Sequence, residues 1–244
     1  MLKSPCVALL AVSLLLAGCA GAPATPTGPA QPAHTSELAA TYAALQATGG
    51  GTWALNPARS DVRIYAFRAG RAAAMGHNHV LTAPEFVGYF HRGTQAMGAM
   101  RFDLQFRLDQ LILDDARLRA TLGQGFASEM SDDAIASTRK NMLGTNGLQA
   151  QQFPWVRIRS LQIVGEAPKF AAQVAVELHG QTRAMWVALT TTGWPERLQV
   201  TGSLVLRQTD FGLQPFSVLG GLLAVEDAVV VDFALEGSRW SPVR

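Results

Sequence analysis

The chain has 244 residues, of which 48% are hydrophobic and 16% are charged, and its formal net charge is +2. This length and apolar content are sufficient for one sizeable hydrophobic core. Basic and acidic residues are interspersed, so nothing in the charge pattern indicates nucleic acid or another polyanion as a partner. No uninterrupted apolar run reaches the length of about 18 residues that a membrane-spanning helix requires.

Residues 1–18 have the order of features that is typical of a secretory signal peptide. Lys3 supplies the positive charge and residues 7–16 supply the short apolar region. The tetrapeptide LAGC that ends at Cys19 resembles the lipobox of bacterial lipoproteins, which implies cleavage before Cys19 and acylation of that cysteine. Ala20 follows, and by the same resemblance favours the outer membrane. We therefore expect a periplasmic protein anchored to the membrane through Cys19; the alternative is a buried apolar helix with an incidental cysteine.

Residues 19–50 are expected to form a tether between this anchor and the folded domain. The tether is rich in Pro, Ala and Gly, and it contains a possible short helix over residues 36–47 that either docks on the domain or frays. Three glycines at residues 49–51 mark the domain boundary. Cys6 leaves with the signal peptide, so no internal disulfide is available and burial alone must hold the domain together.

Residues 51–240 read as one mainly β domain. Apolar and polar residues alternate with a period of two, which indicates half-buried strands. The predicted strands span residues 53–55, 61–67, 86–92, 100–108, 155–163, 174–178, 183–191, 198–207 and 225–239.

Two segments interrupt this rhythm. Ser131 and the two aspartates after it begin a predicted helix over residues 131–143, and Gly144 ends it. Residues 208–224 are too long for a hairpin turn and rich in Gly, Phe and Leu, so they are expected to pack over one end of a closed sheet. About eight antiparallel strands with one inserted helix predict a barrel or a sandwich, and periodicity does not tell a hollow barrel from a filled one.

Several motifs, in order, resemble the YceI-like family. They begin with the segments WAL and SDV near residue 53, continue through NMLG, FPW and LHGQTR, and end with TDFGL at residues 209–213, the most specific element. The resemblance implies a lipocalin-like antiparallel β-barrel whose interior binds a long apolar lipid such as a polyisoprenoid or a polyprenyl quinone. Such a bound lipid or quinone is the only non-protein component that it suggests. Neither a catalytic group nor a protein partner is indicated.

Strand alternation selects the residues that we expect to line the lipid-binding interior. A long apolar chain needs few specific contacts, because each buried methylene contributes about 0.8 kcal/mol. For any one of these residues, ordinary core packing is the simpler interpretation. The predicted lining consists of Val62, Ile64, Phe102, Leu104, Phe106, Val174, Val176, Val187, Leu204, Val229, Val231 and Phe233.

A segment with two histidines departs from the commoner family pattern, which has one. In an extended segment His77 and His79 point the same way, at a spacing that a metal or haem iron can use. A third ligand would have to come from His91, His179 or an acidic residue. This pattern supports an alternative function as a metal- or haem-linked redox module, but hydrogen bonding of both imidazoles to backbone groups at a barrel mouth is the favoured interpretation.

No catalytic constellation is complete in the sequence. Neither a GxSxG nucleophile elbow nor a phosphate-binding glycine loop occurs. Asp210 is expected to bind backbone amides within its loop, whereas Asp227 has no evident partner. We therefore expect a non-enzymatic lipid carrier, and a filled barrel with a structural role is the second alternative.

Overall fold

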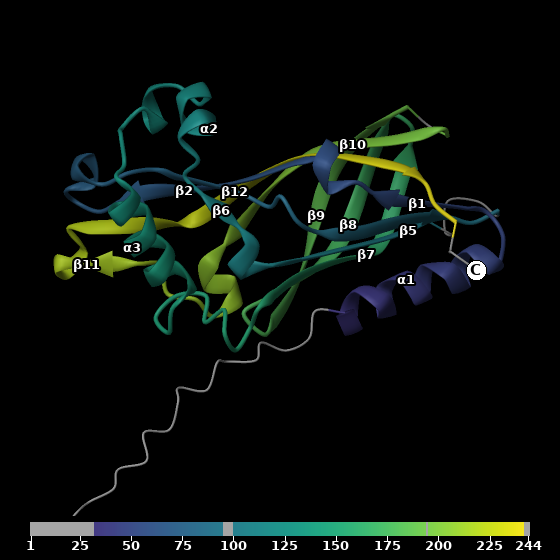
Figure 1. Ribbon diagram of the computed structural model, residues 1–244, viewed down its shortest axis with the longest axis horizontal. Coiled ribbons are helices and arrows are strands. Elements are labelled where there is room, and N and C mark those ends of the chain that lie inside the picture. Colours follow the sequence, from purple (N-terminus) through teal and green to yellow (C-terminus); the bar gives the residue numbers. More distant parts are fainter. Residues whose placement is uncertain (1–31, 95–99, 194, 242–244) are drawn as a thin grey trace, which may run out of the picture. The chain divides into compact units, whose positions relative to one another are not determined.

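The computed structural model describes residues 32–94, 100–193 and 195–241. The predicted signal peptide, the proposed lipidation site Cys19 and the first part of the tether lie outside these described residues. Figure 1 shows the strands, with α2, α3 and β11 gathered near one end of the sheet and α1 beside its other end.

Eight antiparallel strands form a closed ring. The order around the ring is β1, β4, β5, β7, β8, β9, β10 and β12, and β12 pairs back onto β1. Closure removes the exposed edges of the sheet. The fold is therefore the lipocalin-like antiparallel barrel that the sequence predicts. The ring strands are β1 (Gly51–Leu55), β4 (Val87–Arg92), β5 (Met100–Arg107), β7 (Trp155–Glu166), β8 (Lys169–Leu178), β9 (Gln181–Thr192), β10 (Arg197–Arg207) and β12 (Leu223–Arg239).

The long strand β12 belongs to two parts of the sheet. Its last residues pair with β1 and close the ring, whereas residues 224–234 pair with β2 and extend the sheet beyond it. The extension was predicted only in part, because β3, β6 and β11 are too short to show a period of two. The additional strands are β2 (Asp61–Ala69), β3 (His79–Thr82), β6 (Ile112–Leu113) and β11 (Ser217–Val218).

Alternation along the strands places apolar side chains inside the barrel. Leu104 and Phe106 of β5 are buried in one core cluster, and Val174 and Val176 of β8 are buried in another. Opposite Phe233 of β12 lies Gly202 of β10. A Cβ atom at Gly202 would stand 2.5 Å from the Phe233 ring, so this glycine leaves the space that the aromatic side chain occupies inside the barrel.

Two helices are inserted between β6 and β7, whereas the sequence predicts one. The expected helix is α3 (Asp132–Leu143), which begins after its N-cap Ser131 and ends at Gly144. The missed helix is α2 (Ala116–Thr121), whose N-cap Asp115 accepts a hydrogen bond from the backbone of Leu118. Its six residues are too few to show helical periodicity. Ile135, Met142 and Leu143 of α3 pack against the core.

The helix that precedes the barrel, α1 (Pro32–Ala47), packs against β4 and β1. Tyr42 is fully buried, stacks on Tyr89 and donates a hydrogen bond of 2.8 Å to Asp103. Burial and the neighbouring carboxylate raise the pKa of the Tyr42 hydroxyl far above its usual value. Of the two alternatives for this helix, docking is therefore the correct one. Neither α1 nor any other helix of the described residues combines the length and the apolarity that crossing a membrane requires.

Candidate ligand-binding site

The barrel encloses a cavity of about 390 Å³ whose lining is predominantly apolar. This volume lies within the range of roughly 300–1,000 Å³ that is usual for small-molecule sites. The cavity borders residues from every strand of the ring and from β2, β3, β6 and α3. A barrel filled by its own side chains, one of the alternatives that the sequence left open, is therefore wrong.

All twelve residues that strand alternation selects border this cavity. They come from β5, β8, β9, β10 and β12 of the ring and from β2, which extends the sheet. Their positions agree with the prediction, and their role in binding lipid is a proposal that is developed below.

Some of the other lining residues lie outside the predicted strands, where strand alternation gives no information. Thr138 and Asn141 reach the cavity from α3, and Gln208 and Gln214 reach it from the loop before β12. Helical periodicity shows which face of α3 is apolar, but it does not show that this face closes a barrel. The pairing of β3 with β2 likewise brings His79 to the cavity, which the short strand did not reveal.

The apolar loop between β10 and β12 divides into an inner and an outer part. Phe211 and Leu213 are buried in the core and border the cavity, as expected for a segment that packs over the sheet. The short helix η7 (Leu219–Gly221) and its neighbours face solvent instead. Phe216 borders the cavity and is also 46% exposed, so this part of the lining lies at the surface.

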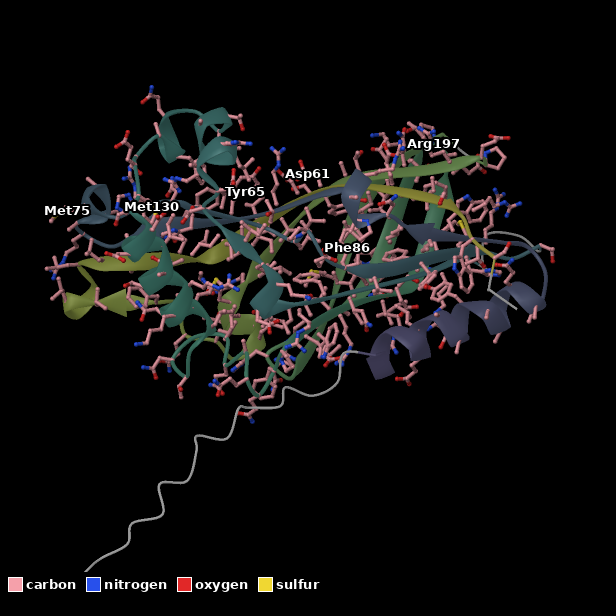
Figure 2. The ribbon with its side chains drawn as sticks, in the orientation of Figure 1. Asp61, Tyr65, Met75, Phe86, Met130 and Arg197 are labelled. Atoms are coloured by element: carbon pink, nitrogen blue, oxygen red, sulfur yellow. The ribbon has the colours of Figure 1, made fainter. Side chains whose placement is uncertain are left out.

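The exposed apolar side chains near this loop form a surface that we call the apolar tip. Among the apolar residues of the loop, Leu219 is the most exposed, at 71%. The backbone oxygen of Leu222 accepts a hydrogen bond from the backbone of Ala72, which joins the loop to the β2–β3 connection. Figure 2 labels Met75 at the same end of the barrel. The apolar tip consists of Met75, Phe216, Val218, Leu219 and Leu222.

The two histidines form separate hydrogen bonds with side chains. His77 Nδ1 lies 2.9 Å from Ser128 Oγ, and His79 Nδ1 lies 2.6 Å from Asp114 Oδ2. The prediction that both bind backbone groups is therefore wrong. The side chains of Ser128 and Asp114, from the segment between β6 and α3, bond to the two Nδ1 atoms instead. Only His79 lies in a strand, and only His79 borders the cavity.

Asp114 is the centre of this polar network. Its side chain is completely buried, and its Oδ1 accepts hydrogen bonds from the backbone of Val80 at 3.0 Å and from Arg119 at 2.6 Å. Burial alone would raise the pKa of Asp114, but the hydrogen bonds from His79, Val80 and Arg119 outweigh burial and hold that pKa below its usual value. The carboxylate is therefore ionised and compensated by Arg119.

Arg119 extends the network to the surrounding loops. Its guanidinium also donates to the backbone oxygens of Asn78 and Ser128 and to the Ser128 hydroxyl. The serine and the aspartate thus contact different histidines, so these groups do not form a serine–histidine–aspartate relay. We call Asp114, Arg119, Ser128, His77 and His79 the polar network.

His91 and His179 lie apart from this network. His91 is buried and its Nδ1 lies 3.0 Å from the hydroxyl of Thr52, and His179 Nδ1 lies 3.1 Å from the backbone oxygen of Phe211. Desolvation lowers the pKa of His91. Among the residues that the structure describes, no three His, Cys, Asp or Glu side chains converge as metal ligands.

The expected roles of Asp210 and Asp227 are reversed in the structure. Asp227, for which the sequence indicates no partner, accepts from the backbone and hydroxyl of Thr209 at 2.8 Å and from Arg207 at 3.0 Å. These bonds lower the pKa of Asp227. Asp210 was expected to bind backbone amides, but it is Asp227, from the facing strand β12, that orders the start of the TDFGL segment.

A closed antiparallel barrel with an apolar interior and few polar lining groups defines the class of small barrels that bind hydrophobic ligands. Comparison with known proteins gives the family. Residues 53–237 match the model of the YceI-like domain, so the chain belongs to the YceI-like family. Barrels of this family bind hydrophobic ligands such as polyisoprenoids, and the family is not a known family of enzymes.

One solved structure supports the same fold. The chain is similar to BcnA of Burkholderia cenocepacia, with a TM-score of 0.54 and 12% identity over 75% of this chain and 98% of that chain. The YCEI protein of Campylobacter jejuni matches with a TM-score of 0.48 and 7% identity over 66% of this chain and 85% of that chain. No curated protein matches the sequence.

Proposed function

We propose that this chain is a lipid-anchored carrier that holds a long-chain lipid of the polyisoprenoid or polyprenyl-quinone type inside its barrel, without catalysing a reaction. The observation that carries the proposal is the apolar cavity, whose lining runs along the strands. On β10 the lining residues Leu198 and Leu206 are eight positions apart (206 − 198 = 8), which corresponds to roughly 26 Å along the strand at about 3.3 Å per residue. A cavity of this length suits an extended chain better than a compact ligand.

The apolar tip supports a role in exchanging the ligand with a membrane. Exposed apolar patches beside a binding site mark contact surfaces, and Phe216 connects this one directly to the cavity lining. Arg68 and Arg71 are exposed beside it, and residues 70–76 and 212–223 contain no acidic side chain. This combination of apolar and basic groups complements the surface of a bilayer that contains anionic lipids.

The location rests on the N-terminal sequence. A lipobox that ends at Cys19 places acyl chains on that residue, and more than one chain on a single residue anchors a protein firmly. We propose attachment to the periplasmic side of the outer membrane. Metabolic labelling with radioactive palmitate tests the anchor: label is expected in the wild-type chain and not in Cys19→Ala, and equal labelling of both chains contradicts it.

Mass spectrometry of lipids extracted from the gently purified protein tests the function. A long apolar lipid, present in amounts comparable to the protein, is the expected result. A protein that contains no such lipid and that, when delipidated, also fails to bind a polyprenyl quinone is not a carrier of this type.

A further inference from the structure

The cavity is not equally apolar along its length. At one end it borders Leu55, Phe90, Leu198 and Leu235, all of which are hydrocarbon side chains. The cross-strand register places His79 in one row with Ala66, Val229 and Leu206. This row lies farther along the barrel, because Leu206 follows Leu198 by eight residues on β10. The polar residues Gln208 and Gln214 follow in the loop beyond that row. A bound amphipathic chain would therefore place its tail at the leucine-rich end and its head near His79.

His79 is held in a fixed orientation. Its Nδ1 bonds to a completely buried carboxylate that does not border the cavity, whereas His79 does. The carboxylate is held in place by hydrogen bonds from the Val80 backbone and from Arg119. Arg119 is held in turn by a hydrogen bond to the backbone oxygen of Asn78. The second ring nitrogen, Nε2, has no hydrogen-bond partner among the described residues. The imidazole thus adds a polar group, with one ring nitrogen left over, to the mostly apolar residues that line the cavity.

The donors around Asp114 determine which kind of group Nε2 can bind. The ionised carboxylate accepts every bond that it makes, so the shared proton lies on His79 Nδ1. In a neutral imidazole the other nitrogen is then a hydrogen-bond acceptor. In that neutral form Nε2 is suited to a donor, such as a hydroxyl group, rather than to a carbonyl or ether oxygen.

We infer that His79 is a head-group residue: it accepts a hydrogen bond from the hydroxyl of a long-chain alcohol, prenol or quinol whose apolar tail lies in the barrel. This inference rests on the proposed function and narrows its ligand class. Asp114 and Arg119 act as positioning residues, because they orient the imidazole without contacting the ligand.

A matched pair of ligands tests the inference without relying on any variant. Farnesol and farnesyl methyl ether share a chain, but only farnesol has a hydrogen-bond donor. Each is titrated against the wild-type protein at mildly alkaline pH, with displacement of fluorescent phenylnaphthylamine as the readout. One hydrogen bond of ordinary net strength predicts that farnesol binds about fivefold more tightly. Equal affinities for the two ligands overturn the inference while leaving the proposed function intact.

Variants of the two histidines assign the preference to one atom. His79→Phe is expected to bind both ligands equally, with its affinity for the ether within about twofold of the wild-type value. His77→Phe is the matched control, because His77 does not border the cavity, and it is expected to keep the preference for the alcohol. If His79→Phe does not fold, His79→Leu provides the same comparison. A preference that persists without the imidazole contradicts the assignment to His79, and failure of the wild-type protein to bind either ligand contradicts the proposed function itself.

Discussion

The barrel wall and the polar network beside it use opposite means to hold their side chains. The wall consists of apolar residues from many strands, and no single one of them is tied by a directional contact. The polar network depends on one buried carboxylate that receives hydrogen bonds from a backbone amide, an arginine and a histidine. The wall should therefore tolerate hydrophobic substitution and discriminate ligands poorly, whereas the network should be sensitive to change and selective.

Loss of the central carboxylate is expected to have the largest effect. Asp114→Ala leaves Arg119 and His79 buried without their shared partner, and the alanine must also adopt the positive φ of 54° found there. Breaking a buried ion pair in this way costs about 3–5 kcal/mol in the free energy of unfolding. Urea unfolding of the wild-type chain and the variant measures this difference in the free energy of unfolding. Glu177→Ala removes the half-exposed partner of Arg157 and serves as a control, with an expected cost below about 1 kcal/mol. Similar costs for both variants would show that the network is no more important than a surface pair.

Blocking the interior is expected to weaken ligand binding strongly without a comparable loss of stability. Val187 and Ala188 are neighbours on β9, and they face the cavity and the solvent respectively. Val187→Trp occupies space that the ligand needs, and displacing two methylenes is enough to weaken binding about tenfold. Ala188→Trp adds the same ring outside and should bind like the wild-type protein. Titration with farnesyl methyl ether measures both, and unchanged affinity in Val187→Trp would place the ligand outside the barrel.

The lowered pKa of Asp114 predicts that the free energy of unfolding depends on pH in the acidic range. Because this pKa is lower in the folded chain than its unfolded value of about 3.9, ionisation stabilises the fold above that pH. The stabilisation is lost as the pH falls through the lower folded value. The difference in the free energy of unfolding between the wild-type chain and Asp114→Ala should therefore narrow below about pH 4. A difference that stays constant down to the acid limit would exclude a carboxylate with a lowered pKa.

The smallest expected effect concerns the apolar tip. Leu219→Asp places a charge on the surface that we propose contacts lipid, so the rate of farnesol transfer to anionic vesicles should fall about threefold while the equilibrium affinity stays the same. Val205 is 60% exposed and lies outside the tip, so Val205→Asp is the control. Equal transfer rates for both variants would mean that the tip takes no part in exchange.

The barrel was predictable because alternation along single strands reports which side chains face inward. Phe102, Leu104 and Phe106 of β5 show this, because all three border the cavity and alternation selects them without knowledge of the partner strands. The polar network was not predictable, since it joins His77 and His79, just before and at the start of β3, to Asp114, Arg119 and Ser128 from a separate insertion. The same limit explains the reversed assignment of Asp210 and Asp227, because Asp227 reaches Thr209 from another strand across the sheet.

The position of the bound chain tests the central claim most directly. Methyl NMR spectra of the protein are recorded with a long-chain alcohol that has a nitroxide near the middle of its tail. The account predicts that the methyl signals of Val174, Val187 and Val231 broaden more than those of the exposed Val164 and Val205, because the first three residues border the cavity and the paramagnetic effect falls steeply with distance. Broadening that is confined to Leu219 and Leu222 of the apolar tip, or none at saturating ligand, would contradict a lipid held inside the barrel.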